Sequence, residues 1–207
     1  MAQGLEKIKL IIWDWYNTLS KTHLYQDLKY SSPAAYEQVQ KFFQEGDKRL
    51  ALWMRGELSY KQIHAHFSGI TGLDRSVFDN SLSAMSGKYD VDERILPYIR
   101  KVKGIGIKQV IATDNFDIWD EFFLPQYSQY ISELFDGNYN SAKFRIMKAD
   151  EGGKLLKTIM EEFKVLPTQT LLIDDNIQVT EMFEELGGNT ISHEGIDDLK
   201  RKLALLI

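Results

Sequence analysis

Short runs of apolar, β-branched residues alternate along the chain with stretches in which apolar side chains recur every three or four positions. Buried parallel strands are predicted at residues 8–13, 108–113 and 170–173, with a weaker strand at 189–192 and a further short one near 134–136. Amphipathic helices are predicted between them, at residues 93–103, 153–164 and 179–186. This alternation indicates right-handed βαβ units and a parallel sheet.

The stretch between the first two predicted strands differs, because it lacks a convincing buried strand and its apolar residues are spaced as in helices. Three helices are expected there: residues 34–55, residues 59–67 with Ser59 as the cap, and a segment that begins at Asp74 or Ser76. We therefore expect an α/β fold in which a Rossmann-like parallel sheet core is flanked by helices. The core comprises residues 1–20 and 90–207, and residues 21–89 form a helical cap subdomain inserted after the first core strand.

Composition narrows the possible classes of protein. The 207 residues carry a formal net charge of −5 and include no cysteine. The lack of cysteine excludes disulfide frameworks, thiolate metal sites and cysteine-based catalysis, and the mild acidity disfavours nucleic acid or an anionic membrane as a partner. No apolar run approaches the ~20 residues of a membrane-spanning helix, and the first residues lack a signal-peptide pattern, so we expect a cytoplasmic protein.

Polar side chains directly follow the three strongest predicted strands. They are Asp14 after the first, Thr113, Asp114 and Asn115 after the second, and Asp174 and Asp175 after the third. Ligands of open parallel sheets bind at the carboxyl ends of the strands, so these side chains are expected at one edge. Three carboxylates gathered there would repel one another, and Mg²⁺, which prefers oxygen ligands, is the simplest ion to neutralise them.

The residues around these positions resemble the signature motifs of the haloacid dehalogenase-like (HAD) hydrolases. The segment Ile-Ile-Trp-Asp-Trp-Tyr-Asn-Thr-Leu at residues 11–19 resembles the first motif, in which an apolar strand leads into an aspartate followed four residues later by a threonine. Residues 110–113 are similar to the second motif and residues 171–176 to the fourth. The resemblance spans essentially the whole chain, and the helical insertion lies where many members carry a cap.

The resemblance implies a role for each matching residue. Asp14 would be the nucleophile that forms a covalent aspartyl intermediate, and Thr113 would donate a hydrogen bond to the substrate oxygens. Thr18 would brace the turn that exposes Asp14. Thr18, Asp114 and Asn115 are the candidates for binding a small phosphorylated substrate.

The same resemblance implies a Mg²⁺ site. Asp14 and Asp175 would hold the ion, Asp174 would contribute less directly, and the residue at position 16 would offer its backbone carbonyl. The lysine that pairs with the nucleophile is expected to be Lys148, because Met147-Lys148-Ala149-Asp150 resembles the Lys-Pro-Asp context of many members. Lys154 and, less favoured, Lys143 are the alternatives.

Tyr16 departs from the pattern of most phosphatases in this family, which have a second aspartate there as general acid and base. Unperturbed pKa values are ~3.9 for Asp and ~10 for Tyr, so Tyr16 cannot readily activate water at neutral pH. As a catalytic residue it could still donate a proton or a hydrogen bond to a leaving group. Members that act on carbon–halogen bonds do carry tyrosine here, but they work without metal and lack the paired aspartates.

Three hypotheses follow. The first is a Mg²⁺-dependent phosphatase, the second a metal-independent 2-haloacid dehalogenase, and the third a catalytically weak binding or regulatory protein on the same scaffold. His23 could reach a substrate from the cap entrance, and Arg49, Trp53 and Arg55 could supply an anion-binding wall, although surface and core roles are commoner for such residues. The substrate and the oligomeric state stay open.

Overall fold

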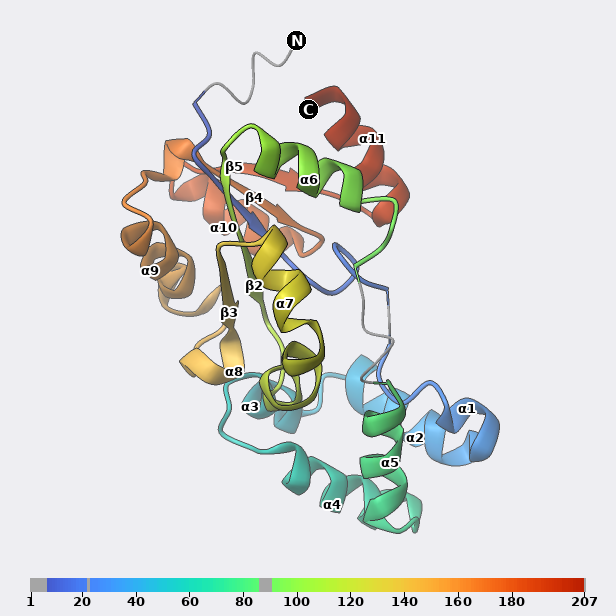
Figure 1. The fold of residues 1–207 in the computed structure, drawn as a ribbon. Coiled ribbons are helices and arrows are strands. Elements are labelled where there is room, and N and C mark those ends of the chain that lie inside the picture. The colour runs from blue at the N-terminus through green and yellow to red at the C-terminus, as the bar shows by residue number, and fades with distance from the viewer. Residues whose placement is uncertain (1–6, 22, 86–90, 207) are drawn as a thin grey trace.

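Five parallel strands form one sheet in the order β3-β2-β1-β4-β5 (Figure 1). The computed structural model describes residues 7–21, 23–85 and 91–206, with the backbone alone for residues 127–130. The strands are β1 (Leu10–Trp13), β2 (Lys108–Thr113), β3 (Gly137–Asn140), β4 (Thr170–Asp174) and β5 (Asn189–Ser192). The predicted α/β class with a parallel sheet is confirmed.

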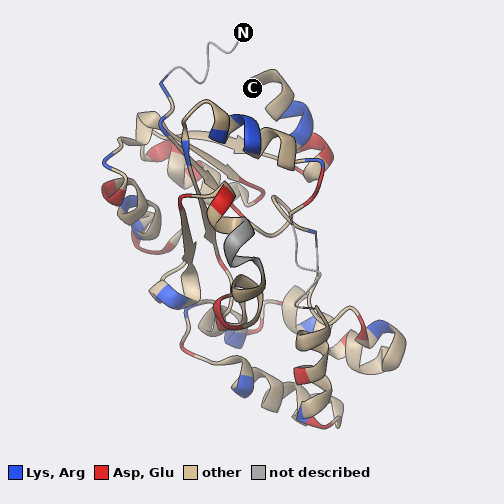
Figure 2. Ribbon diagram, viewed as in Figure 1, with Lys and Arg blue, Asp and Glu red and all other residues tan. Residues whose placement is uncertain are grey.

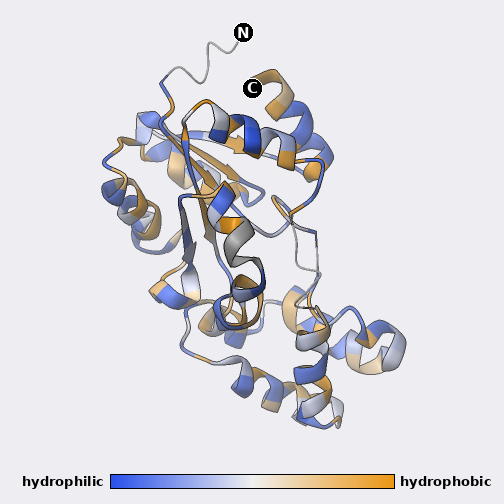
Figure 3. Cartoon of the chain, viewed as in Figure 1, coloured by the Kyte–Doolittle hydropathy of each residue, from blue (hydrophilic) through white to orange (hydrophobic). Residues whose placement is uncertain are grey.

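The central strand β1 is apolar on both faces, which is why it is buried between two layers of helices. Ile11 and Trp13 belong to the apolar cluster that includes residues of α6, α7 and α11, whereas Leu10 and Ile12 belong to the cluster with α9 and α10. Each such side chain stabilises the fold by roughly 1.5–3 kcal/mol when fully buried. In Figure 3 the central strands of the sheet carry the orange of apolar residues.

Six α-helices and a π-helical turn, Trp119–Phe123, accompany the described part of the sheet. The helices are α6 (Leu96–Gly104), α7 (Leu124–Leu134), α8 (Ser141–Phe144), α9 (Lys154–Glu162), α10 (Ile177–Glu185) and α11 (Ile196–Leu206). Short 3₁₀ turns lie at Asp150–Gly152 and Pro167–Gln169. The strand expected near residues 134–136 begins at Gly137 instead, because Leu134 still ends α7 and the next two residues connect that helix to β3.

Five further helices form a separate group that we call the helical lobe, at the foot of Figure 1. They are α1 (Leu28–Ser31), α2 (Pro33–Gln44), α3 (Lys48–Met54), α4 (Tyr60–Thr71) and α5 (Arg75–Met85). The single helix expected over residues 34–55 is wrong: Gly46 adopts a φ of +67°, and the Asp47 side chain accepts the N–H of Arg49 to begin a new helix. The expected boundary between residues 89 and 90 lies outside the described residues.

Polar contacts join the connection between α3 and α4 to the core. Trp53 Nε1 and the Tyr60 backbone N–H both donate to the Asp117 carboxylate, at 2.7 Å and 3.0 Å to the nearer oxygen. Arg55 makes two hydrogen bonds of 2.7 Å with Asp150. The lobe is therefore held beside the carboxyl ends of β2 and β3.

Charged residues of both signs are interspersed over the core and the lobe (Figure 2). None of the helices in the described ranges combines the length and the apolar character needed to cross a membrane.

Candidate active site

The turn after β1 places Asp14 and Tyr16 at the carboxyl edge of the sheet. The Asp14 backbone N–H donates to the Ile173 carbonyl at 2.9 Å, which continues the pairing of β1 with β4. Asn17 then takes a φ of +58°, a conformation that asparagine tolerates better than most residues, and its side-chain amide donates to Asp175 at 2.9 Å. This geometry fixes the turn against the loop that follows β4.

Lys148 lies between two buried carboxylates. Its Nζ donates to Asp14 Oδ1 and to Asp174 Oδ2, each at 2.6 Å, and all three side chains are almost completely inaccessible to solvent. The Lys148 backbone N–H donates to Asp114 Oδ1 at 2.8 Å, so Asp114 holds the lysine loop. Burial disfavours the charge on Lys148, but Asp14, Asp174 and Asp114 together raise its pKa above the ordinary value. Lys148 is therefore a fixed ammonium.

Burial raises the pKa of the Asp14 carboxyl well above its usual value, and the charge of Asp174 acts in the same direction. The Lys148 ammonium opposes both effects because it stabilises the carboxylate form. Burial likewise raises the pKa of Asp114, again with Lys148 opposing it. The site thus concentrates negative charge where water provides little compensation.

Three carboxylates at this edge could hold a cation. Asp14, Asp174 and Asp175 each offer an oxygen, and these oxygens lie within 4.8 Å of one another. Lys148 takes one oxygen of Asp14 and one of Asp174, and the Asn176 N–H donates to the second oxygen of Asp174 at 2.9 Å. The carboxylates of Asp14 and Asp175 are therefore more available to bind a cation than the carboxylate of Asp174. An all-oxygen set with excess negative charge fits Mg²⁺.

Thr18 and Thr113 are both buried beside this cluster, Thr113 as the last residue of β2. The Gly195 N–H donates to His193 Nδ1 at 3.1 Å, so Nδ1 is unprotonated and Nε2–H donates to Thr18 Oγ1 at 3.0 Å. Thr18 is thereby tied to the loop after β5. Sequence reasoning missed His193, although it directly follows the fourth predicted strand and obeys the same positional rule as Asp14 and Asp174.

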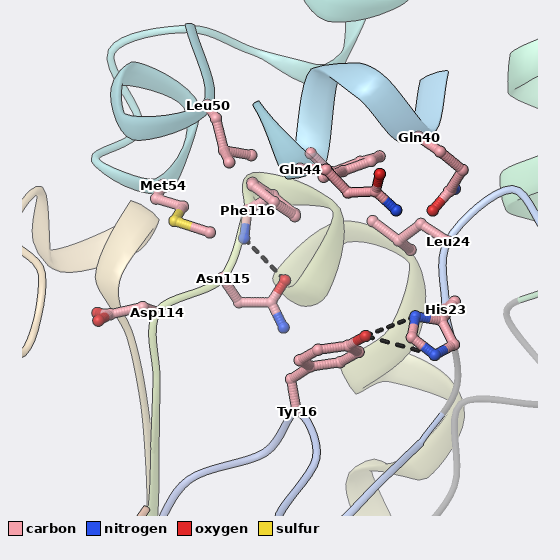
Figure 4. Close-up of a pocket in the computed structure, with 11 residues that line it drawn as sticks. Tyr16, His23, Leu24, Gln40, Gln44, Leu50, Met54, Asp114, Asn115 and Phe116 are labelled. Carbon is pink, nitrogen blue, oxygen red and sulfur yellow. Dashed lines mark hydrogen bonds between the residues drawn. The ribbon is translucent and has the colours of Figure 1, made fainter. Parts of the chain in front are cut away.

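A cavity of about 350 Å³ lies between these loops and the helical lobe (Figure 4). It is lined by Tyr16, His23, Leu24, Gln40, Phe43, Gln44, Leu50, Met54, Asp114, Asn115 and Phe116. Sequence reasoning named only Tyr16, His23, Asp114 and Asn115 among them. The signal for the lobe residues was weak. Helical spacing puts Gln40, Phe43 and Gln44 on one face of a helix, but it does not reveal that this face of α2 lines the cavity.

Tyr16 and His23 meet in the wall of this cavity. The Tyr16 hydroxyl and His23 Nδ1 form a hydrogen bond of 2.5 Å (Figure 4). Burial raises the pKa of Tyr16, and the negative charge of Asp175 adds to this effect. Tyr16 therefore stays a neutral phenol that can donate or accept a hydrogen bond.

Asn115 and Asp114 present different groups to their surroundings. Asn115 Oδ1 accepts the Phe116 N–H at 2.9 Å, and the Asn115 side-chain nitrogen is directed toward Tyr16 in Figure 4. The Asp114 carboxylate points away from Tyr16 and His23 in the same view, toward its contact with the Lys148 loop.

Other residues considered from the sequence lie away from the cluster. The Lys154 ammonium pairs with Glu151 at the surface, 59% exposed. Arg49 pairs with Asp47, and Arg55 pairs with Asp150. Neither arginine lines the cavity. Trp53 is buried and stacks on Phe116 with ring centroids 3.9 Å apart.

The parallel sheet, the helices inserted after β1 and the aspartates at its carboxyl edge define a Rossmann-like α/β architecture. The chain belongs to the haloacid dehalogenase-like hydrolases, since the model of that family matches residues 8–187. A search of the curated proteins found no match to the chain.

Solved structures share this fold at low sequence identity. A HAD family enzyme from Bacteroides thetaiotaomicron, solved as a magnesium complex, is 14% identical with a TM-score of 0.74, over 95% of this chain and 98% of that one. A predicted HAD-like hydrolase from Porphyromonas gingivalis is 17% identical with a TM-score of 0.70 over the same shares. The L-2-haloacid dehalogenase from Xanthobacter autotrophicus is 15% identical with a TM-score of 0.66, over 95% and 82% of the two chains.

Replacing Lys148 with Met would leave Asp14 and Asp174 buried without their cation. We expect Lys148→Met to lower the free energy of unfolding by about 3–5 kcal/mol. The control Lys154→Met removes only an exposed ion pair and should cost less than about 1 kcal/mol. Urea unfolding in the presence of a chelator measures both values, and equal losses would contradict a bridging role for Lys148.

Proposed function

We propose that this protein is a Mg²⁺-dependent phosphatase that hydrolyses a small phosphate monoester through a phosphorylated Asp14. The observation that carries the proposal is the buried Lys148 ammonium, bonded to both Asp14 and Asp174 at 2.6 Å, with Asp175 beside them. A plain structural ion pair would not require a third carboxylate at the same place. The fold of the magnesium-bound HAD enzyme from Bacteroides thetaiotaomicron supports the same assignment.

In the first step, a carboxylate oxygen of Asp14 attacks the phosphorus atom and the bond from phosphorus to the alcohol oxygen breaks. The alcohol leaves with the electron pair of that bond and takes a proton from water. Lys148 orients Asp14 for the attack, and the Thr113 hydroxyl donates to a phosphoryl oxygen as its charge develops. Thr18, fixed by His193, braces the turn that carries the nucleophile.

In the second step, a water oxygen attacks the phosphorus of phospho-Asp14. The bond from phosphorus to the Asp14 oxygen breaks, which restores the carboxylate and releases inorganic phosphate together with the proton of the attacking water. One ester and one water thus give one alcohol and one phosphate.

Mg²⁺ would be held by Asp14, Asp175 and the backbone carbonyl of Tyr16, with Asp174 contributing less directly, and would offset charge on the phosphoryl oxygens. The helical lobe acts as the cap, and its helices α2 and α3 cover the cavity. The alcohol part of the substrate is selected by Asn115 of the core together with the lobe residues that line the opposite side. On this view residues 21–89 are the cap and the remainder is the catalytic core.

A phosphatase assay with an aryl phosphate tests the proposal. We expect the wild-type protein to release phosphate with Mg²⁺ and to lose at least about 10²-fold of its rate in excess chelator, because the carboxylate cluster then keeps its excess charge. Asp14→Asn should abolish turnover. The control Asp197→Asn makes the same change at a side chain of α11 that is 79% exposed, and it should retain most of the activity. Undiminished hydrolysis by Asp14→Asn would refute a covalent role for Asp14.

Tyr16 is expected to limit the rate, because a phenol replaces the carboxylate that would activate water. General acid–base assistance contributes typically about 10²–10⁴ in rate, so Tyr16→Asp should raise kcat by at least about tenfold. Tyr16→Phe is the matched control and should bring no gain. If the wild-type protein turns over rapidly and Tyr16→Asp has a lower kcat, the tyrosine itself is required and the expectation is wrong.

The second candidate is a metal-independent 2-haloacid dehalogenase, which Tyr16, two residues after Asp14, favours. In that reaction Asp14 would displace halide from carbon and the aspartyl ester would then be hydrolysed. Halide release from 2-chloropropionate in excess chelator, without phosphatase activity, would establish this alternative. The absence of both activities with retained Mg²⁺ binding would favour a binding protein.

A further inference from the structure

The cavity between the active-site loops and the lobe has a lining that restricts the alcohol part of the substrate. Its volume of about 350 Å³ is at the lower end of the range of roughly 300–1,000 Å³ for small-molecule sites. Apolar side chains from both sides form most of its wall: Leu24, Phe43, Leu50, Met54 and Phe116. The cavity therefore suits a small group with an apolar surface.

The aromatic part of this wall is held rigidly. Phe43 and Phe116 have ring centroids 6.1 Å apart with an angle of 56° between the ring planes. Trp53 stacks behind Phe116 at 3.9 Å and is itself fixed by its hydrogen bond to Asp117. An aromatic or other flat group can pack against these rings without displacing charged neighbours.

Charge is distributed unfavourably for a second anion. The described lining contains neither lysine nor arginine, and its one carboxylate, Asp114, would repel an anionic group. The two nearby arginines of the lobe are already engaged, Arg49 with Asp47 and Arg55 with Asp150. A carboxylate or second phosphate in the cavity would lose water without gaining a lysine or arginine partner in the described lining.

Neutral hydrogen-bonding groups complete the lining. Gln40 and Gln44 lie four residues apart and so share one face of α2, opposite Asn115 (Figure 4). Three amides can serve a hydroxyl or carbonyl group at the edge of an otherwise apolar molecule.

We propose that the substrate is a monophosphate ester of a small, uncharged, largely apolar alcohol or phenol, and that esters with a second anionic group are rejected at this cavity. This inference rests on the proposed phosphatase function. It follows from the largely apolar, aromatic lining, from the single carboxylate in it, Asp114, and from the absence of a lysine or arginine in it, within the part of the chain that the structure describes.

The test compares phenyl phosphate with 4-carboxyphenyl phosphate, which adds one carboxylate to the same ring. For the wild-type protein with Mg²⁺ we expect kcat/KM to be at least about tenfold higher for phenyl phosphate, because the added carboxylate is buried without a partner. Gln44→Lys places an ammonium on the cavity face of α2 and should narrow this ratio to within about threefold. Gln38→Lys, on an exposed position of the same helix outside the lining, adds the same charge and should leave the ratio unchanged.

A wild-type ratio near one, or a ratio that Gln44→Lys and Gln38→Lys change equally, would overturn the inference while leaving the phosphatase function intact. If neither ester is hydrolysed, the proposed function fails. The affinities of two non-hydrolysable analogues then test the selectivity of the cavity on their own. Calorimetry with phenylphosphonate and 4-carboxyphenylphosphonate, neither of which can be hydrolysed, then gives the answer. Binding at least about tenfold tighter for phenylphosphonate would support the inference, and equal or reversed affinities would refute it.

Discussion

The contact of the Lys148 ammonium with two buried carboxylates is the interaction on which the site depends. Trp13 pairs with Ile173 in adjacent parallel strands, so the residues that follow them, Asp14 and Asp174, must come out side by side. Two unscreened negative charges at that place would oppose folding, and Lys148 provides the compensating charge at 2.6 Å from each. The loop that carries the lysine is itself fixed through Asp114 and the Arg55–Asp150 pair. Sheet register, loop conformation and the position of the lobe are thereby coupled.

Much of the core could be predicted from the sequence because its signals are local. Apolar runs of strand length marked β1, β2 and β4, and the rule that ligands bind at the carboxyl ends of parallel strands singled out Asp14, Thr113 and Asp174. Features that depend on tertiary packing were missed. The helix α7 was not expected, and the break at Gly46 depends on a backbone conformation that spacing alone does not reveal. Spacing also left open the lysine, whose placement against Asp14 depends on how its loop folds.

Tyr16 connects the chemistry of the site with the shape of the cavity. As a neutral phenol bonded to His23, it belongs to a wall that otherwise consists of apolar side chains, amides and one carboxylate, that of Asp114. The proposed function therefore combines a highly charged reaction centre, in which Lys148 and a bound Mg²⁺ would offset three carboxylates, with a largely apolar chamber for the rest of the substrate. Such a division favours leaving groups that need little help from an acid. On this proposal, a chain can keep the aspartates that would bind Mg²⁺ and lack the second aspartate of the first motif.

The proposed function depends on covalent phosphorylation of Asp14, which rapid acid quenching during turnover can detect. The wild-type protein is mixed with Mg²⁺ and an aryl phosphate, quenched within the first turnover, digested and analysed by mass spectrometry. We predict one added phosphoryl group on the peptide that contains Asp14, absent when a chelator is included. Hydrolysis of the ester with no phosphoryl group on Asp14 at any quench time, or with the group on another residue, would contradict a mechanism through phospho-Asp14.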